Sequence, residues 1–355
     1  MIPLRKEGIL KSSPANCDKL FAIVRTRVEV FLRKLGFSFF PHGRRLGKLL
    51  DKVIRNCAVC GDTLLPRFRE VLDPLTNEIF SIDRCARCGL GHTVPQPRDM
   101  RPYYPDRYYG KRHGIFSRHC VKRRLGFVAA AIPEGSGKRL LDIGCGDGSF
   151  LIAAREVGWD VLGTELILGP ARNTGLDVRE SIDQFPASAS FDCITMWHTL
   201  EHMPDILSVL LKIARLLKPG GKLIVATPDF GGLQARIFRK KWLHADVPRH
   251  LYHFDTKALL HCLGAAGFSI QQKWHQEFEY DLLGWSQSTL NCIMPYPNVY
   301  FDCLTGKGKR YGKLITMYGY VVGSFLSLLS LPAVALGTLC GQGGTLVIVA
   351  CQKLE

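Results

Sequence analysis

Acidic residues are scarce in this chain relative to basic ones. Its 355 residues include 31 Asp and Glu against 47 Lys and Arg, which gives a formal net charge of +16 at pH 7. So basic a composition argues against a cationic partner and favours an anionic one: nucleic acid, phospholipid or a phosphorylated small molecule. Hydrophobic residues make up 46% of the chain, enough for a sizeable core in one large domain plus a small one, or in two domains.

The sequence also lacks the marks of a secreted, disulfide-linked protein. Arg5 and Lys6 lead into no apolar block, so we expect no signal peptide. Four of the thirteen cysteines form two Cys-x-x-Cys pairs, and the other nine follow no regular spacing. We therefore expect a cytoplasmic protein, with peripheral attachment to the inner face of a membrane as an option that the basic charge leaves open.

Charged side chains are absent from Leu314 to Gln352. The run Leu314–Leu339 is long and apolar enough to span a bilayer, but a full span would remove the strand-like Thr345–Ala350 from the rest of the fold. Because Pro332 should break the run, we expect a hairpin that dips into a membrane and returns. Flanking cations would hold it at anionic headgroups: Lys307, Lys309, Arg310 and Lys313. A dimer interface, or internal packing as a lid over a pocket, is the alternative for stretch 314–340.

Residues 1–56 contain thirteen basic and four acidic side chains, more than half of the total excess. Within them, apolar residues recur at helical spacing: Leu20, Val24, Val28, Phe31 and Leu35. This pattern predicts an amphipathic helix. It lies either on an anionic membrane surface or on the protein's own core with its basic face in solvent.

Two pairs of cysteines, each followed by glycine, predict a structural zinc ribbon. The pairs are Cys57/Cys60 and Cys85/Cys88, and four thiolates on two tight turns complete a tetrahedral site. Asp73–Asn77 between the pairs is typical of a hairpin turn. A redox pair is the alternative, disfavoured because neither pair opens a βαβ unit.

Prolines at four positions between residues 93 and 112 indicate an ordered linker. The paired tyrosines in it, Tyr103-Tyr104 and Tyr108-Tyr109, either close over a ligand or simply pack.

A buried strand, a glycine loop and a helix start follow one another at the centre of the chain. Leu140–Ile143 is the strand, glycines stand at 144, 146 and 148, and the helix begins at Ser149. Such a loop brings backbone close to a ligand. A dinucleotide fingerprint needs a glycine where Ser149 stands, and Asp142 would repel a pyrophosphate. The loop therefore favours a ligand that carries an amino group and a sulfonium.

Strands and helices alternate after this loop, which predicts a doubly wound, Rossmann-like α/β sheet. The expected strands are 140–143, 159–165, 176–179, 191–196, 222–228, a strand opening at 268–270, and 344–350. The expected helices begin at Ser149, at Pro204 and after Asp255, which should cap its helix.

Leu141-Asp142-Ile143-Gly144-Cys145-Gly146-Asp147-Gly148 resembles the Asp-x-Gly-x-Gly-x-Gly signature of class I S-adenosylmethionine-dependent methyltransferases. The resemblance covers residues 57 to 275 and the last dozen, and its motifs resemble small-molecule methyltransferases with an N-terminal zinc ribbon. It implies cofactor contacts from the loop and from strand ends: Asp142, Gly144, Cys145, Gly146, Gly148, Ser181, Met196 and Trp197. Glu165 ends the second strand, 23 positions after Asp142, where an acid grips both ribose hydroxyls.

Two histidine-containing segments are candidates for the acceptor side. Residues 197–205 resemble the family's box after strand four, in which Leu-Glu-His is common; Glu201 and His202 either hold loops or act as base. Residues 242–254 are dense in histidine and aromatics. An oxygen or carbon acceptor needs a base: His250 first, then His253 and His202. A three-histidine metal site is an alternative.

These expectations divide the chain into five parts. They are a basic extension (1–56), a zinc ribbon (57–95), a Pro/Tyr linker (96–125), a methyltransferase domain (126–275 and 342–355) and a hydrophobic helical insertion before the last strand (276–341).

The core is similar to the methyltransferases of quinone biosynthesis, and the ribbon is similar to that of sugar C-methyltransferases. The resemblance implies an enzyme that transfers a methyl group from S-adenosyl-L-methionine to a small or lipid-linked acceptor. The basic and apolar segments add a membrane surface to this expectation, and the cysteine pairs add structural zinc. It leaves a homo-oligomer open. A nucleic-acid methyltransferase is disfavoured because Trp-His-Thr-Leu replaces an Asn-Pro-Pro-Tyr-like box. A non-catalytic membrane-associated protein of this fold is the other alternative.

Overall fold

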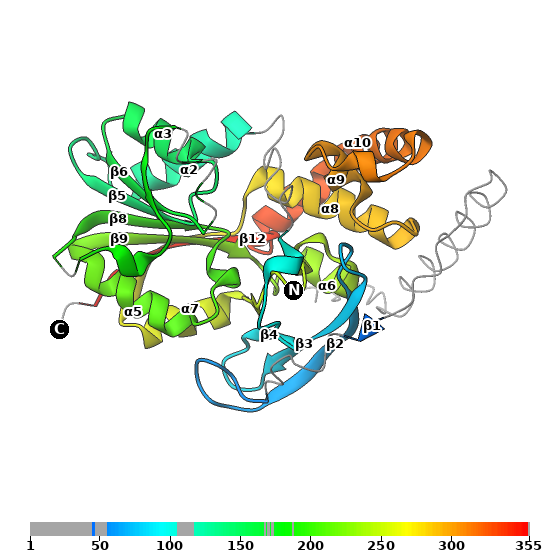
Figure 1. Ribbon diagram of the computed structural model, residues 1–355, viewed down its shortest axis with the longest axis horizontal. Helices are drawn as coiled ribbons and strands as arrows, with labels where there is room; N and C mark the ends of the chain where they lie inside the picture. Colours follow the sequence, from blue (N-terminus) through cyan, green and yellow to red (C-terminus); the bar gives the residue numbers. More distant parts are fainter. Residues whose placement is uncertain are drawn as a thin grey trace, which may run out of the picture.

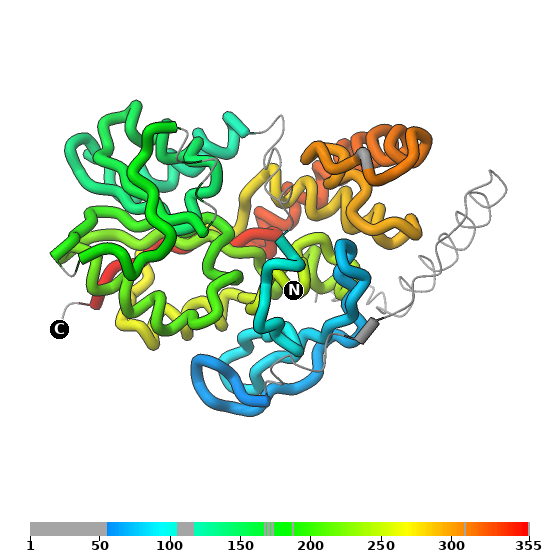
Figure 2. Tube along the Cα trace, in the orientation of Figure 1, coloured from blue at the N-terminus to red at the C-terminus, as the bar shows by residue number. Residues whose placement is uncertain are grey.

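The computed structural model describes residues 45–46, 55–104, 117–166, 168, 171, 174–186 and 188–353 (Figures 1 and 2). The expected amphipathic helix between Leu20 and Leu35 lies outside these residues, as do Tyr108 and Tyr109.

A seven-stranded sheet forms the centre of the molecule. Its strands lie in the order β11-β12-β9-β8-β5-β6-β7. All neighbouring strands run parallel except at β12, which is antiparallel to both of its neighbours. The bounds are β5 (Arg139–Ile143), β6 (Asp160–Thr164), β7 (Asp177–Arg179), β8 (Phe191–Trp197), β9 (Leu217–Pro228), β11 (Phe268–Trp274) and β12 (Thr345–Gln352). The expected Rossmann-like sheet is confirmed.

Helices cover both faces of this sheet (Figure 1). On one side lie α2 (Ser117–Ala131) and α3 (Ser149–Glu156), and on the other α5 (Ile206–Leu216) and α7 (Thr256–Ala265). Asp205 and Asp255 cap the last two by accepting backbone N–H bonds at 3.0 and 2.8 Å. Because strand side chains alternate, each face of the sheet has its own apolar core.

A second, smaller sheet contains the cysteine segments. It is built from β1 (Arg45–Leu46), β2 (Leu64–Leu72), β3 (Glu78–Cys85), β4 (Gly91–Val94) and β10 (Tyr252–His253). The predicted turn joins β2 to β3, with Asp73 accepting the Thr76 N–H at 3.1 Å. Since β10 comes from the segment after the seven-stranded sheet's β9, this sheet is tied to the larger unit, and Figure 2 shows the two lying together.

The insertion before β12 is helical. It consists of α8 (Phe278–Ile293), α9 (Val299–Leu304) and α10 (Lys313–Leu339), and α8 contacts α6 (Leu233–Phe238). α10 packs on both α8 and α9, and it approaches α9 through glycines: a Cβ on Gly319 would lie 2.5 Å from Val299, and one on Gly323 2.2 Å from the Tyr300 ring.

The expectation of a hairpin broken at Pro332 is wrong, because α10 continues through Pro332. Pro332 is exposed, so its ring meets no neighbouring element, and it removes just one backbone N–H. Beyond it, Val334 and Gly337 are buried and keep the helix in place.

Candidate active site

One cavity of about 270 Å³ begins at the glycine loop and extends to the insertion. The loop after β5 and Trp197 at the end of β8 form one end. His202 and His250 lie along its side, and Tyr280 and Tyr300 come from α8 and α9. A cavity at the carboxyl ends of parallel strands is where an open α/β sheet binds its ligands.

The glycine loop turns as the sequence indicates. Gly144, Gly146 and Gly148 have φ angles of +75°, +62° and +77°, in the left-handed region where glycine is favoured. Gly148 is the N-cap of α3 and lies outside the cavity lining, whereas Gly144, Cys145 and Gly146 line it. Asp142 also lines the cavity, is 2% exposed, and accepts the Thr195 hydroxyl at 2.6 Å.

Glu165 lies beside this loop, directly after β6. Its carboxylate accepts the Gly146 N–H at 2.8 Å, and the side chain is buried. Glu165 therefore holds the loop from the end of β6, and it is not among the residues that line the cavity.

The other expected cofactor residues occupy different places. Trp197 lines the cavity, with the Arg124 guanidinium 5.1 Å from its ring centroid. Met196 is fully buried in the core on the opposite face of the sheet, because adjacent strand residues point to opposite sides. The Ser181 hydroxyl caps a short 3-10 helix at Ile182–Gln184 and does not line the cavity.

A buried ion network that the sequence did not indicate joins the glycine-loop end to the insertion. His198, in a left-handed conformation at φ +53°, stacks on Tyr280 at 4.0 Å and contacts the Glu277 carboxylate through Nε2. Arg123 donates to Glu277 at 2.6 Å and to Glu279 at 2.8 Å. Burial alone would lower the pKa of His198, but Glu277 and Glu201 outweigh it and raise the pKa above its ordinary value.

His202 and His250 face each other beside the cavity, with ring centroids 4.8 Å apart. The Nδ1 of His202 lies 2.8 Å from the Arg249 carbonyl oxygen, and the Nδ1 of His250 lies 2.9 Å from the His244 carbonyl oxygen. Burial, with the neighbouring His250, lowers the pKa of His202 to about 4. Tyr104 from the linker contacts the same Nδ1 of His202 at 3.1 Å, so it packs behind this corner.

His253, the third candidate base, does not line the cavity. It is buried in β10, and its Nε2 lies 3.0 Å from the Thr93 hydroxyl. Burial holds its pKa well below the ordinary value. The structure therefore places His250 and His202 together at the cavity and His253 apart from them.

The far end of the cavity is lined by aromatic and charged side chains. Arg249 is paired at 3.0 Å with Asp73 from the β2–β3 turn and also contacts Asp246. Lys307 lines the cavity, as does Arg310, which donates to Asp302 at 2.5 Å.

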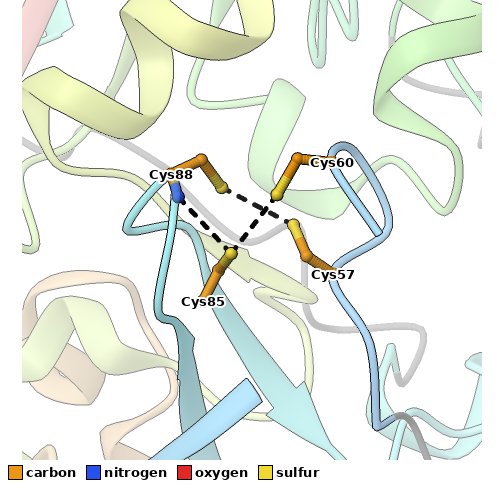
Figure 3. Close-up of side chains that lie close together, drawn as sticks. All are labelled: Cys57, Cys60, Cys85 and Cys88. Atoms are coloured by element: carbon orange, nitrogen blue, oxygen red, sulfur yellow. Dashed lines mark hydrogen bonds between the residues drawn. The ribbon is translucent and has the colours of Figure 1, made fainter. Parts of the chain in front are cut away.

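The four cysteines of the two pairs lie together at one end of the small sheet (Figure 3). The Sγ atoms of Cys57 and Cys88 are 3.6 Å apart, and those of Cys60 and Cys85 are 3.4 Å apart. All four Sγ atoms lie within 4.8 Å of one another, and none of the four forms a disulfide. Four zinc–sulfur bonds of about 2.3 Å fit this spacing.

The comparisons with known families agree with the fold. Residues 110–273 match the family model of a methyltransferase domain. This match covers the glycine loop, Glu165, and the histidines at 202 and 250.

Curated relatives match over a shorter stretch. The ubiquinone biosynthesis O-methyltransferase of Xanthomonas oryzae pv. oryzae is 35% identical over 145 residues, which cover 37% of this chain and 60% of that protein. The protein of that name from Salmonella arizonae is 32% identical over 136 residues, covering 35% of this chain and 53% of that protein. The chain thus spans between half and two thirds of the length of these relatives.

Solved structures of low sequence identity overlap with larger parts of the chain. A phospholethanolamine N-methyltransferase of Haemonchus contortus has a TM-score of 0.49 at 18% identity, covering 75% of this chain and 62% of that one. A putative sarcosine dimethylglycine methyltransferase of Galdieria sulphuraria has a TM-score of 0.45 at 14% identity, covering 66% and 85%.

Proposed function

We propose that this chain, whose residues 110–273 match the model of a methyltransferase domain, transfers a methyl group from S-adenosyl-L-methionine to a small or lipid-linked acceptor. The observation that supports this most is the cavity that begins at the glycine loop, with Asp142 in its lining and Glu165 at the adjacent strand end. The relatives named for ubiquinone biosynthesis favour a small-molecule acceptor.

In this proposal the loop 144–148 seats the methionine part of the cofactor, and Trp197 closes one side of the cavity. Asp142 offers a carboxylate near the positively charged end of the donor. The Glu165 carboxylate binds the ribose hydroxyls, where each hydrogen bond to a charged acceptor contributes about 1.5–3 kcal/mol.

The acceptor would lie on the other side of the methyl group, between the insertion and the two histidines His202 and His250. Methyl transfer from a sulfonium is a displacement in line, so alignment of donor and acceptor supplies most of the rate. For an oxygen acceptor we place proton removal at His250, with His202 as the second choice, because both line the cavity. His253 is the weakest of the three because it lies outside it.

Membrane attachment belongs to the same proposal. α10 is long and apolar enough to cross a membrane, and just 22% of its most apolar 18-residue window is buried. Leu328 and Leu329 are 67% and 60% exposed. A helix lying in the headgroup region would bury this apolar face, and Lys313 at its start would contact anionic lipids.

We also propose that Cys57, Cys60, Cys85 and Cys88 bind structural zinc. Their spacing supports this, as do the tight turns that carry them. Zinc here would staple the small sheet, and its four thiolates would leave no open position for chemistry.

Incubating the purified protein with labelled S-adenosylmethionine and membrane extracts, followed by separation of lipid and aqueous phases, tests the function. Label should enter one phase and should do so much less with Glu165→Ala. Wild-type protein that binds S-adenosylmethionine but labels neither phase would contradict the proposed methyl transfer.

The membrane part has its own test. Sedimentation with vesicles containing anionic lipid should carry down the wild type, and the double variant Leu328→Asp/Leu329→Asp should stay in the supernatant. Val157→Asp, at another exposed apolar residue far from α10, is the matched control. A wild type that remains fully in the supernatant would contradict membrane attachment. A wild type that instead forms dimers through α10 supports the interface alternative.

A further inference from the structure

Glu201 is a buried carboxylate without the hydrogen bonds that such a group requires. Its side chain is 1% exposed, and neither oxygen has a hydrogen-bond partner among the residues that the structure describes. The nearest ring nitrogens are Nδ1 of His198 at 3.6 Å and Nε2 of His250 at 3.9 Å, both too long for a hydrogen bond. His198 offsets part of the negative charge of Glu201 from 3.6 Å, but neither carboxylate oxygen is hydrogen-bonded, so both remain available as ligand atoms for a metal ion.

The imidazole rings of His202 and His250 are held in place by hydrogen bonds to backbone carbonyl oxygens. A carbonyl oxygen accepts hydrogen bonds and does not donate them, so the Nδ1 atoms of His202 and His250 carry the hydrogen that each gives to a carbonyl. The Nε2 atom of each neutral ring therefore has a lone pair. Metal-binding histidines are commonly oriented in this way, by a backbone carbonyl on the other ring nitrogen.

We propose that Glu201, His202 and His250 bind a divalent transition-metal ion beside the cavity. One possible ligand atom of each residue lies within 4.8 Å of those of the other two. Two imidazoles and one carboxylate suit zinc, iron, cobalt or manganese. This site is separate from the cysteine cluster and differs from it in ligand chemistry and in being open.

Three protein ligands leave at least one coordination position free. Because His202 and His250 line the cavity, an ion held by their rings would be reachable from the cavity. This inference rests on the proposed function and refines it. An oxygen of the acceptor would complete the coordination of the metal ion. His250 would then bind the ion instead of removing the proton of the acceptor. Coordination lowers the pKa of an acceptor hydroxyl, so its proton is lost to water. The oxygen then bonds to the methyl carbon, and the electron pair of the broken carbon–sulfur bond stays on the sulfur.

Equilibrium dialysis of the full chain against Co²⁺, with metal and protein then measured, tests the site without any substrate. The wild type should bind one Co²⁺ more per chain than Glu201→Gln or His250→Gln, whose affinity at this site should fall tenfold or more. The cysteine cluster is unchanged in every variant, so the difference counts ions at this site alone. Glu180→Gln and His261→Gln, away from the cavity, are matched controls and should bind like the wild type.

Equal Co²⁺ binding by the wild type and both variants would overturn the inference. Far-ultraviolet circular dichroism checks that each variant folds, and His202→Gln replaces one that does not. Binding of S-adenosylmethionine is measured in parallel by calorimetry. A wild type that binds S-adenosylmethionine but no additional Co²⁺ would contradict the metal site alone. A wild type that binds the additional Co²⁺ but no S-adenosylmethionine would contradict the proposed function.

Discussion

Glu165 is the residue on which cofactor recognition depends most in this account. It lies at the end of β6, and its carboxylate already accepts a hydrogen bond from the loop at Gly146. Replacing it with alanine should weaken S-adenosylmethionine binding tenfold or more, because hydrogen bonds to a charged acceptor are lost. Calorimetric titration measures this, with the exposed Glu180→Ala as control. Unchanged affinity in Glu165→Ala would refute the ribose role.

The raised pKa of His198 predicts how the stability of the fold changes with pH. Its pKa is raised in the folded protein, so its ion pair stabilises the fold fully below about pH 6.5, the unfolded value, and the effect is lost as pH rises through the raised pKa. Glu277 has a lowered pKa, so its share is present above about pH 4.5 and is lost as pH falls further.

The free energy of unfolding of the wild type should therefore exceed that of His198→Asn most between about pH 5 and 6.5. Asparagine is chosen because it tolerates the positive φ of this position. The difference should shrink toward alkaline pH, as measured by urea denaturation across the range. A difference that grows between pH 7 and 9 would contradict the assigned ion pair.

At the scale of elements, α10 depends on close contact at its glycines. Gly323→Ala should lower the free energy of unfolding by about 1–3 kcal/mol, because the new Cβ would lie 2.2 Å from the Tyr300 ring. Gly126→Ala is the matched control: it lies in α2, is exposed, and its Cβ would meet nothing within 4 Å. That control should be neutral or stabilising by up to about 1 kcal/mol. Equal thermal stability of the two variants would show that α10 does not pack as described.

Elements with a strong local pattern could be predicted from the sequence. The apolar runs before Gly144 and after Lys222 became β5 and β9, and Asp255 caps α7 as expected. The expected break at Pro332 was wrong, because the packing of residues on both sides of it, such as Gly323 and Val334, outweighs the local cost of a proline within a helix. The His198–Glu277 contact joins residues 79 positions apart, and no spacing rule predicts it.

The same limit applies to single site residues. Period-two alternation puts the side chains of Met196 and Trp197 on opposite faces of the sheet, and this much was available from the sequence. The distance between His250 and Glu201 was not, because the two come from separate loops. Their approach depends on the backbone bond from the Leu251 N–H to the Glu201 carbonyl.

At the scale of the whole molecule, the small sheet and the large one share chain segments. β10 begins two residues after His250 and pairs with β4, so the cysteine cluster supports the segment that carries His250. Loss of zinc should therefore destabilise more than the ribbon. Cys57→Ser should lose zinc and lower the thermal midpoint by several degrees, at about 2–4 °C per kcal/mol. Cys303→Ser is the control, because Cys303 is also buried but belongs to the separate apolar core of the insertion, and this variant should keep its metal. Metal analysis that finds no zinc in the wild type would dispose of this prediction.

The central claim is that a positively charged methyl donor lies on the loop 144–148 with its ribose at Glu165. A crystal structure of the protein soaked with S-adenosylhomocysteine, the demethylated product, tests it most directly. The account predicts the amino-acid part against Gly144–Gly146 and both ribose hydroxyls within hydrogen-bond distance of Glu165. Density for the product elsewhere, or a cavity that takes up a phosphate-rich nucleotide in its place, would contradict it.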